Sequence, residues 1–343
     1  MKRRVAIVAG GMSSEHEISC ISAGGVLSAI DRSKYEPILI GITKDGRFVI
    51  PDERQKLGIE NGVLPEISSG REIHFAEAIR ELKIDVVFPV LHGPYGEDGT
   101  FQGECEMAQI RYVGSGVLAS AVAMDKSFAK PIFASHGLRV ADGLTIHARD
   151  WSGSVDLGSL SFPVFVKPAR GGSSKGTSKV KSSSELRSAI EAALEFDTKV
   201  MIEEAIVGRE IECAVLQIGG VAHASPLGEI KIDSRFEFYD FEAKYLEGST
   251  TVVTPAEIPS AATEAIQRAA VAAFSALGCE GLARVDFFYS EAGEIVINEI
   301  NTMPGFTPSS VFPKLWAQGG KSYVEIISTL IESALARPIS LMR

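Results

Sequence analysis

The stretch LARVDFFYSEAGEIVINEINTMPG, residues 282–305, decides the fold of the last third of the chain. Two runs of alternating side chains flank the turn SEAGE, which is the pattern of a β-hairpin. The second run ends in Glu299 and Asn301, and the Met-Pro-Gly of 303–305 then prevents the strand from continuing. An acid and an amide therefore stand together at the end of an otherwise apolar strand.

The first strand of this hairpin also carries polar side chains. Arg284 and Asp286 point to one side of it, and they meet Glu299 and Asn301 if the polar faces of the two strands coincide. Carboxylates at such short distances repel each other, so a positive charge must lie among them. Oxygen ligands with no His or Cys nearby favour Mg²⁺. The alternative is a surface network of arginine and carboxylates, and these residues alone leave both interpretations open.

Length and composition limit the class of protein. The 343 residues suggest two or three domains of roughly 100–200 residues each. The 45% of hydrophobic residues suffices for apolar cores. Lys and Arg number 34 and Asp and Glu 44, which gives a formal net charge of −10. An acidic chain without a basic block is a poor nucleic-acid binder, so we expect no nucleic-acid partner.

The amino terminus and the cysteines indicate the compartment. MKRRVAIVAGG is too short an apolar run for a signal peptide, and no later run approaches the roughly 18 apolar residues of a membrane span. The cysteines are scattered without a C-x-x-C pair: Cys20, Cys105, Cys213 and Cys279. Their spacing argues against a zinc site or a disulfide framework and fits a reducing cytosol. We expect a soluble cytoplasmic protein without a membrane partner.

The first third of the chain has the pattern of a parallel α/β unit. We expect strands at 4–10, 35–43 and 84–90, and a helix at 15–30 between the first two. Ser14 and Glu17 have the S-x-x-E spacing of a capping box in front of the helix. Residues 51–73 are polar and weakly patterned, so we expect a surface elaboration there.

From about residue 117 the pattern changes to α+β. We expect a helix from 117 to 137 and another from 183 to 196. Strands are expected at 162–168, 177–181 and 199–206. From 209 onward two more strands, a helix and the hairpin follow. We therefore predict three domains, at 1–114, 115–208 and 209–343, with an N-terminal parallel α/β domain followed by two α+β domains.

A glycine- and serine-rich turn is the first candidate for phosphate binding. GGSSKG, residues 171–176, offers backbone N–H groups that can approach a polyphosphate, with Arg170, Lys175 and Lys167 nearby. It joins two strands and lacks the spacing of a P-loop. A flexible hairpin is the alternative interpretation of this turn.

Several acids could contact a nucleotide or a substrate. Glu203, Glu204 and Glu210 follow a strand end and could accept hydrogen bonds from ribose hydroxyls or an adenine amino group, or could be solvated. VAGGMSSEHE at 8–17 lacks G-x-G-x-x-G, which argues against an NAD-dependent dehydrogenase. Glu15 stands in the first turn of the expected helix, where a carboxylate complements the helix dipole.

Six segments in order along the chain resemble the D-alanine–D-alanine ligases, a branch of the ATP-grasp enzymes. They are HGPYGEDGTFQG (92–103), YVGSGVLASAVAMDK (112–126), FVKPARGGSSKG (165–176), FYDFEAKY (238–245), ARVDFF (283–288) and NEINTMPGFTPSS (298–310). The resemblance implies a three-domain ATP-grasp fold in which two α+β domains clasp ATP. It implies ligation of two D-alanines through a D-alanyl phosphate for peptidoglycan precursor synthesis, with release of ADP and phosphate.

The resemblance also implies a role for each matching residue. The metal ligands would be Asp286, Glu299 and Asn301, holding two Mg²⁺ ions for which Mn²⁺ can substitute. Arg284 and the Gly305 N–H would stabilise the transferring phosphoryl group and the oxyanion. ATP would be bound by Lys126, Lys167, Ser174, Glu203, Glu210 and Lys244. Glu15, Ser173 and Tyr245 would form a hydrogen-bonded trio at the first D-alanine, beside His92, and Ser310 would bind the second.

Further expectations follow from this resemblance. Segments around 170–176 and 234–250 would close over the bound nucleotide, and the chain would form a homodimer. Lys175 departs from the family pattern, which has a small apolar residue there. A D-alanine–D-lactate or D-alanine–D-serine ligase is the alternative on the same fold, although Tyr245 resembles the dipeptide-forming members. A nucleotide-binding regulator without catalysis is the alternative of a different class.

Overall fold

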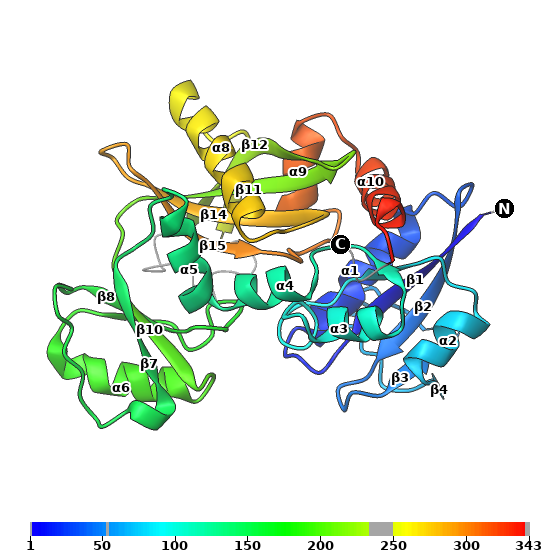
Figure 1. Cartoon of the computed structure of the whole chain (residues 1–343), viewed down its shortest axis with the longest axis horizontal. Coiled ribbons are helices and arrows are strands. Elements are labelled where there is room, and N and C mark those ends of the chain that lie inside the picture. Colours follow the sequence, from blue (N-terminus) through cyan, green and yellow to red (C-terminus); the bar gives the residue numbers. More distant parts are fainter. Residues whose placement is uncertain (1, 53–54, 233–249, 340–343) are drawn as a thin grey trace.

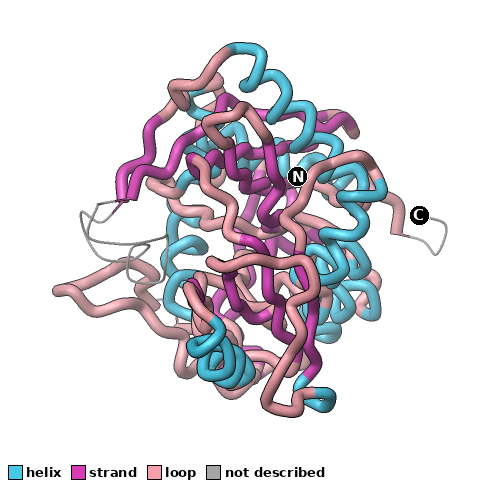
Figure 2. Tube along the Cα trace, turned by 90° about the vertical axis from the view of Figure 1, so that its left-hand side faces the viewer, coloured by secondary structure: helices cyan, strands magenta, loops and turns pink. Residues whose placement is uncertain are grey.

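The computed structural model describes residues 2–52, 55–232 and 250–339. Its strands form three sheets with the orders β4-β3-β2-β1-β5-β6, β7-β10-β8-β9 and β13-β12-β11-β14-β15. Figure 1 shows the first sheet and its helices on the right, the second sheet with α6 at the lower left and the third at the top. Turned by 90°, the strands run through the middle of the molecule and helices flank them (Figure 2).

The first sheet is parallel at its centre, as the sequence predicts. Its strands are β1 (Arg3–Gly10), β2 (Tyr35–Ile42), β3 (Phe48–Ile50), β4 (Arg71–Glu72), β5 (Val86–Pro89) and β6 (Arg111–Tyr112). β1 pairs in parallel with β2 and β5, and β3 and β4 add an antiparallel edge. The helices of this unit are α1 (His16–Ala29), α2 (Phe75–Glu81) and α3 (Thr100–Met107). The carboxyl ends of the parallel strands, where α/β proteins hold ligands, carry the Gly-rich segments after β1 and β5.

Two expectations for this unit are wrong. Glu15, not Ser14, precedes α1, and no side chain caps the helix, because the Glu17 carboxylate instead pairs with Lys44 at 2.6 Å. Residues 51–73 are not merely a surface elaboration. Ile67 and Leu57 are buried in the main apolar core, and the Ile67 N–H donates to His16 Nε2 at 3.0 Å.

The second sheet is small and antiparallel. Its elements are β7 (Gly143–His147), the short helix η1 (Ala148–Asp150), β8 (Val164–Pro168), β9 (Ser178–Val180), α6 (Ser183–Leu194) and β10 (Lys199–Glu204). Alternate residues of its strands, among them Val164, Val166 and Val200, pack against Ile190 of α6. This leaves the other face of β8 and β10 to point away from α6.

The helix expected between 117 and 137 is two helices. α4 (Val117–Met124) ends at Asp125, and α5 (Lys126–Ser135) begins there. The Asp125 carboxylate caps α5 by accepting from the Ser127 N–H at 3.1 Å, and it also pairs with Lys199 of β10. This junction fixes the start of α5 beside the second sheet.

The third sheet contains the predicted hairpin. Its strands are β11 (Arg209–Ile218), β12 (Val221–Ile232), β13 (Thr250–Val253), β14 (Leu282–Tyr289) and β15 (Ile295–Asn301). α8 (Ser260–Ala276) covers one face, and α9 (Val311–Gln318) and α10 (Tyr323–Ala336) pack with the first sheet at the other. Mixed parallel and antiparallel sheets with covering helices confirm the predicted α/β and α+β class. The domain boundaries at 114 and 208 stay a prediction.

The hairpin register contains one β-bulge. Asp286 stands opposite Glu299, but Phe287 stands opposite Ile297, so Asn298 is an extra residue on β15. A bulge reverses the alternation of side chains beyond it. Ile297 is therefore buried in the apolar cluster with Phe287, whereas simple alternation from the sequence places it on the face of Glu299.

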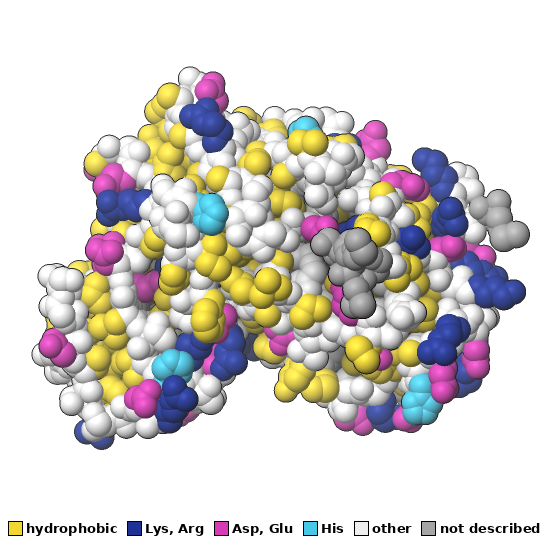
Figure 3. All heavy atoms as spheres, viewed as in Figure 1, with side chains coloured by type: hydrophobic (Ala, Val, Ile, Leu, Met, Phe, Trp, Pro, Cys, Tyr) yellow, Lys and Arg dark blue, Asp and Glu magenta, His cyan; other side chains and the backbone are white. Residues whose placement is uncertain are grey.

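On the face in Figure 3, acidic and basic side chains are intermixed, and no continuous basic stripe crosses the coloured part. Apolar side chains gather in the middle of this face, where α4 and α5 lie. In the described part of the chain, no helix is long and apolar enough to cross a membrane.

The largest core joins the first and third sheets through aromatic rings. The Phe306 ring is fully buried and lies 5.7 Å from the ring of Phe88, 5.9 Å from that of Phe312 and 5.5 Å from that of Tyr323. Phe306 follows Gly305 directly, so this packing also holds the segment after β15 in place.

Phe306→Ala should lower the free energy of unfolding by about 3–5 kcal/mol, because it removes a ring from a close-packed core. Denaturant unfolding followed by tryptophan fluorescence measures this change. Met107→Ala is the control, since Met107 is 85% exposed and its truncation should change stability by less than about 0.5 kcal/mol. Equal effects of the two substitutions would contradict the role of Phe306.

Candidate active site

A cavity of about 970 Å³ is lined by residues of the second and third sheets, of α4 and α5, and of the segments that follow β1 and β5 of the first sheet. Every predicted site residue in the described part of the chain lines it: Glu15, His92, Lys126, Lys167, Ser173, Ser174, Glu203, Glu210, Arg284, Asp286, Glu299, Asn301, Gly305 and Ser310. Lys244 and Tyr245 lie outside the described residues. The cavity is large for a small-molecule site, where roughly 300–1,000 Å³ is usual.

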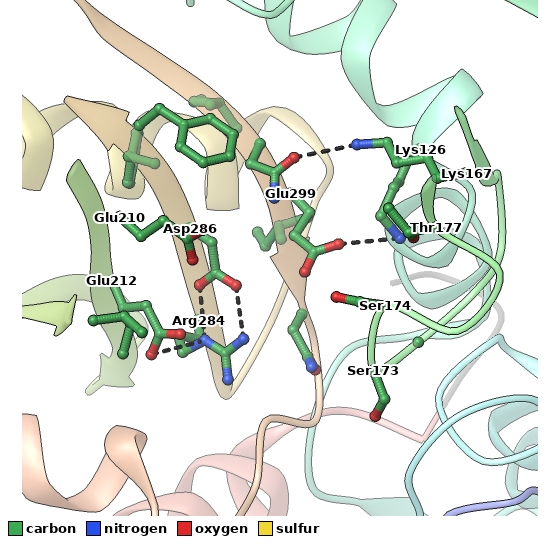
Figure 4. Close-up of a pocket in the computed structure, with 18 of the residues that line it drawn as sticks. Lys126, Lys167, Ser173, Ser174, Thr177, Glu210, Glu212, Arg284, Asp286 and Glu299 are labelled. Carbon is green, nitrogen blue, oxygen red and sulfur yellow. Dashed lines mark hydrogen bonds and ion pairs between the residues drawn. The ribbon is translucent and has the colours of Figure 1, made fainter. Parts of the chain in front are cut away.

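The end of the hairpin brings four polar side chains together. Arg284 stands opposite Asn301, and Asp286 stands opposite Glu299, so the polar faces of the two strands coincide. Arg284 forms a two-pronged ion pair with Asp286, with Nε to Oδ1 and Nη2 to Oδ2 both at 2.7 Å (Figure 4). The pair lies inside the cavity with both side chains less than a fifth exposed, so it is not a surface network.

Arg284 has a second acidic neighbour that the sequence analysis missed. Glu212 of β11 is buried, and its Oε2 lies 3.3 Å from Arg284 Nε. Burial by itself lowers the pKa of Arg284, but Asp286 and Glu212 together raise it well above its usual range. Arg284 is therefore a fixed positive charge on the cavity wall.

A lysine from α5 neutralises the last acid of β15. Lys126 Nζ lies 3.0 Å from Glu299 Oε2, and it also donates to the Gly171 carbonyl at 3.0 Å. Burial opposes the charged lysine, but Glu299 raises the pKa of Lys126 above its ordinary value. Lys126 thus connects α5, the Gly/Ser turn and the hairpin.

A second charged cluster lies between the second sheet and α5. Lys167 Nζ of β8 lies 2.6 Å from Glu203 Oε2 of β10 and 3.3 Å from Asn298 Oδ1. The other Glu203 oxygen pairs with Lys130, a buried lysine that the sequence analysis also missed. Burial lowers the pKa of Lys130 to about 8, whereas the two lysines outweigh burial at Glu203 and lower its pKa to about 2.

The oxygen donors at the hairpin end fit Mg²⁺. Asp286, Glu299 and Asn301 offer two carboxylates and an amide, and Mg²⁺ is usually held by one or two carboxylates together with substrate phosphates. Among the described residues, no three His, Cys, Asp or Glu side chains converge as a metal cluster, so an all-carboxylate cage is absent there. These few protein oxygens suit a cation whose remaining ligands are phosphate oxygens of the substrate.

The Gly/Ser turn contacts the segment between β1 and α1 of the first unit. Ser173 Oγ donates to Glu15 Oε1 at 2.7 Å, which joins residues from two different units. Ser173 and Ser174 both have a left-handed backbone, with φ of 53° and 56°. Such backbones are uncommon outside glycine. Two of the three residues of the predicted trio, Glu15 and Ser173, are therefore in contact.

The loop after β5 adds a histidine and a second acid. His92 Nδ1 lies 2.9 Å from the Met303 carbonyl and Nε2 lies 3.1 Å from Ser22 Oγ, and burial lowers the pKa of His92. Glu97 accepts from the Gly93 N–H at 2.7 Å. Burial and the neighbouring Glu15 raise the pKa of Glu97 to about 8. Glu97 is a site residue that sequence reasoning missed.

The segment after β15 is shaped by hydrogen bonds. Asn301 Oδ1 accepts from the Met303 N–H at 2.9 Å, and Ser310 Oγ accepts from the Thr307 N–H at 3.0 Å. A Cβ on Gly305 would lie 3.2 Å from Ser310 Oγ, so a side chain at that position would crowd the serine. Gly305 and Ser310 are therefore neighbours on one wall of the cavity.

Comparison with family models places nearly the whole chain in one family. Residues 4–115 match the model described as D-ala D-ala ligase N-terminus, and residues 132–332 match D-ala D-ala ligase C-terminus. The D-alanine–D-alanine ligase of Paenarthrobacter aurescens is 48% identical, with 98% of this chain and 96% of that protein covered. That of Streptomyces coelicolor is also 48% identical, with 98% and 94% covered.

Solved structures agree with these relatives. A VanG D-Ala:D-Ser ligase from Enterococcus faecalis superposes with a TM-score of 0.81 at 37% identity, covering 97% of this chain and 100% of that one. A Bacillus anthracis D-alanine–D-alanine ligase complexed with ATP gives 0.76 at 29% identity, with 97% of each chain covered. These matches confirm the resemblance and the ATP-grasp fold, and the chain belongs to the D-alanine–D-alanine ligase family.

Proposed function

We propose that this protein joins two D-alanines to D-alanyl-D-alanine for peptidoglycan precursor synthesis. One D-alanine carboxylate attacks the γ-phosphorus of ATP, which releases ADP and leaves D-alanyl phosphate. The amine of a second D-alanine then attacks the acyl carbon, and phosphate leaves. The observation that carries this proposal is the single cavity that gathers Arg284, the acids of the hairpin end, the lysines of the second unit and Glu15.

The phosphate end of the cavity is built from fixed positive charge. Arg284 would supply a planar fork of donors for phosphate oxygens, and Gly305, whose N–H would assist, lies beside Ser310. Lys126 and Lys167, which now pair with Glu299 and Glu203, would contact ATP phosphates. Charge that is already in place needs no reorganisation as negative charge develops, so these residues lower the barrier.

We propose Asp286, Glu299 and Asn301 as the ligands of two Mg²⁺ ions, for which Mn²⁺ can substitute. Bound metal would neutralise the phosphate oxygens and orient them for in-line transfer. Carboxylates that now pair with Arg284 and Lys126 would then pair with the metal, while the two cations turn to phosphate.

The substrate end is built from the first unit and the Gly/Ser turn. Glu15 and Ser173 would receive the ammonium of the first D-alanine, beside His92, and Ser310 would bind the carboxylate of the second. Burial and Glu15 raise the pKa of Glu97 to about 8, which favours its neutral form and limits the negative charge beside Glu15. Glu210 and Ser174 would contact ATP, and the roles of Lys244 and Tyr245 stay predictions.

Three further proposals rest on the family and on the three sheets. The chain would act as a homodimer, and it would work in the cytoplasm. Its domains would be residues 1–114, 115–208 and 209–343, a division supported by the separation of the three sheets along the chain.

The proposed reaction predicts ADP and D-alanyl-D-alanine from D-alanine, ATP and Mg²⁺ alone. Turnover measured by ADP release, with products identified by mass, tests this prediction. Parallel reactions contain D-alanine with D-lactate, D-alanine with D-serine, and L-alanine. ADP release that requires D-serine or D-lactate would overturn the second-substrate assignment, and binding of ATP without turnover in any mixture would indicate the regulator.

Arg284→Lys should lower kcat by about 10²–10³-fold, because lysine keeps the charge but loses the planar fork needed in the transition state. The Kd of ADP, measured by calorimetry, should change by less than about threefold, since the ground state needs that fork less. Parallel losses of kcat and ADP affinity would show that Arg284 acts only in binding.

Asn301→Ala should raise the Mg²⁺ concentration for half-maximal activity by about tenfold or more, because a metal ligand is lost. The KM for D-alanine at saturating Mg²⁺ serves as the internal control and should stay nearly constant. A metal titration that superimposes on that of the wild type would remove Asn301 from the ligand set.

A further inference from the structure

Three acids form a row across adjacent strands of the third sheet. Glu212 of β11 stands directly opposite Asp286 of β14, and Asp286 stands directly opposite Glu299 of β15. Residues opposite each other on neighbouring strands share one face, with Cβ atoms roughly 4.5–5.5 Å apart. Two members of this row have roles in the proposed function, whereas Glu212 has none.

Glu212 is oriented toward Arg284. Its side chain is 6% exposed, and Oε2 lies 3.3 Å from Arg284 Nε. Figure 4 shows the guanidinium between the carboxylates of Glu212 and Asp286, with both ion pairs drawn. Arg284 is thus held from two sides by acids on two different strands.

The proposed function, on which this inference rests, makes two demands on Asp286. Asp286 accepts hydrogen bonds from both Nε and Nη2 of Arg284. With metal bound, its oxygens would turn toward the cation and weaken that pair. A buried guanidinium that had no other acidic partner would then be strongly destabilised.

We propose that Glu212 is a positioning residue that holds the guanidinium of Arg284 in place while Asp286 ligates metal. Glu212 lies on a strand that carries no proposed metal ligand, so its contact with Arg284 can persist through the reaction. Its position on β11, in the interior of the sheet between β12 and β14, makes it a rigid support. Supports of this kind set the geometry of catalytic groups.

A structural role alone explains the residue less well. The next residues on the same face of β11, Ala214 and Leu216, are apolar and pack in the main core. A buried acid needs a cation to compensate it, and among the described residues Arg284 is the cation that pairs with Glu212. Asp286 also compensates Arg284, so the second acid would be needed when metal weakens that first pair.

Glu212→Gln tests this inference, because it keeps the shape and removes the charge. We expect kcat to fall by about tenfold or more, as displaced catalytic groups act poorly. The KM for D-alanine should change by less than about threefold. Mn²⁺ binding to the ADP complex, followed by electron paramagnetic resonance, should weaken severalfold, since Arg284 then retains Asp286 against the metal. Glu212→Asp keeps the charge and should recover most of the Mn²⁺ affinity.

Asp85→Asn is the control. Asp85 lies just before β5, its carboxylate accepts from the Arg4 N–H at 2.8 Å and pairs with Arg3 at 3.2 Å, and it is not among the residues that line the cavity. This control should lower the melting temperature while kcat stays within about twofold. Equal kcat losses in both variants, or unchanged kcat and Mn²⁺ affinity in Glu212→Gln, would overturn the inference.

The same experiment separates this inference from the proposed function. If the wild type makes D-alanyl-D-alanine and Glu212→Gln behaves like the wild type, only the role of Glu212 fails. If the wild type forms no dipeptide, the proposed function fails, and the Mn²⁺ measurement on the ADP complex still decides whether Glu212 governs the competition between Arg284 and metal.

Discussion

Compensation of buried charge is the constraint on which this site depends. Glu299 is paired with Lys126, Asp286 with Arg284, and Glu203 with two lysines. Acids left unpaired in these positions would repel each other and resist burial. Lys126 and Lys130 come from α5 and Lys167 from β8, so the ion pairs that neutralise Glu299 and Glu203 also bring α5, the second sheet and the hairpin around one cavity. Under the proposed function, nucleotide phosphate and metal would replace these partners charge for charge.

The direction of these side chains depends on the backbone of β15. The bulge at Asn298 lets Ile297 and Ile300 both enter the apolar cluster while Glu299 faces the cavity. A regular strand would turn either Ile297 into the cavity or Glu299 into the core. Phe306 packs in the core directly after Gly305, so core packing and the hydrogen bonds within the segment after β15 together set the position of Gly305.

The sequence predicts most of this arrangement and fails where tertiary contacts decide. The hairpin and the convergence of its polar side chains follow from the alternation along its strands, and Lys126 and Lys167 follow from the resemblance to the family. The bulge does not, because one inserted residue leaves no local signal. The spacing could have indicated Lys130, which lies one helical turn after Lys126, and Glu212, which lies two residues after Glu210 on the same strand. The sequence could not have indicated that Ile67 is buried, because the residues beside it are polar.

The Gly/Ser turn links substrate and nucleotide through its strained backbone. Left-handed conformations at Ser173 and Ser174 cost about 1–3 kcal/mol each and persist only where other contacts hold them. Contacts at both ends of the turn do so: Ser173 binds Glu15, and the Gly171 carbonyl binds Lys126. One contact belongs to the proposed D-alanine subsite and the other to the phosphate subsite. A ligand in either proposed subsite would therefore change the forces on the same short turn, so that closure over one substrate would depend on the other.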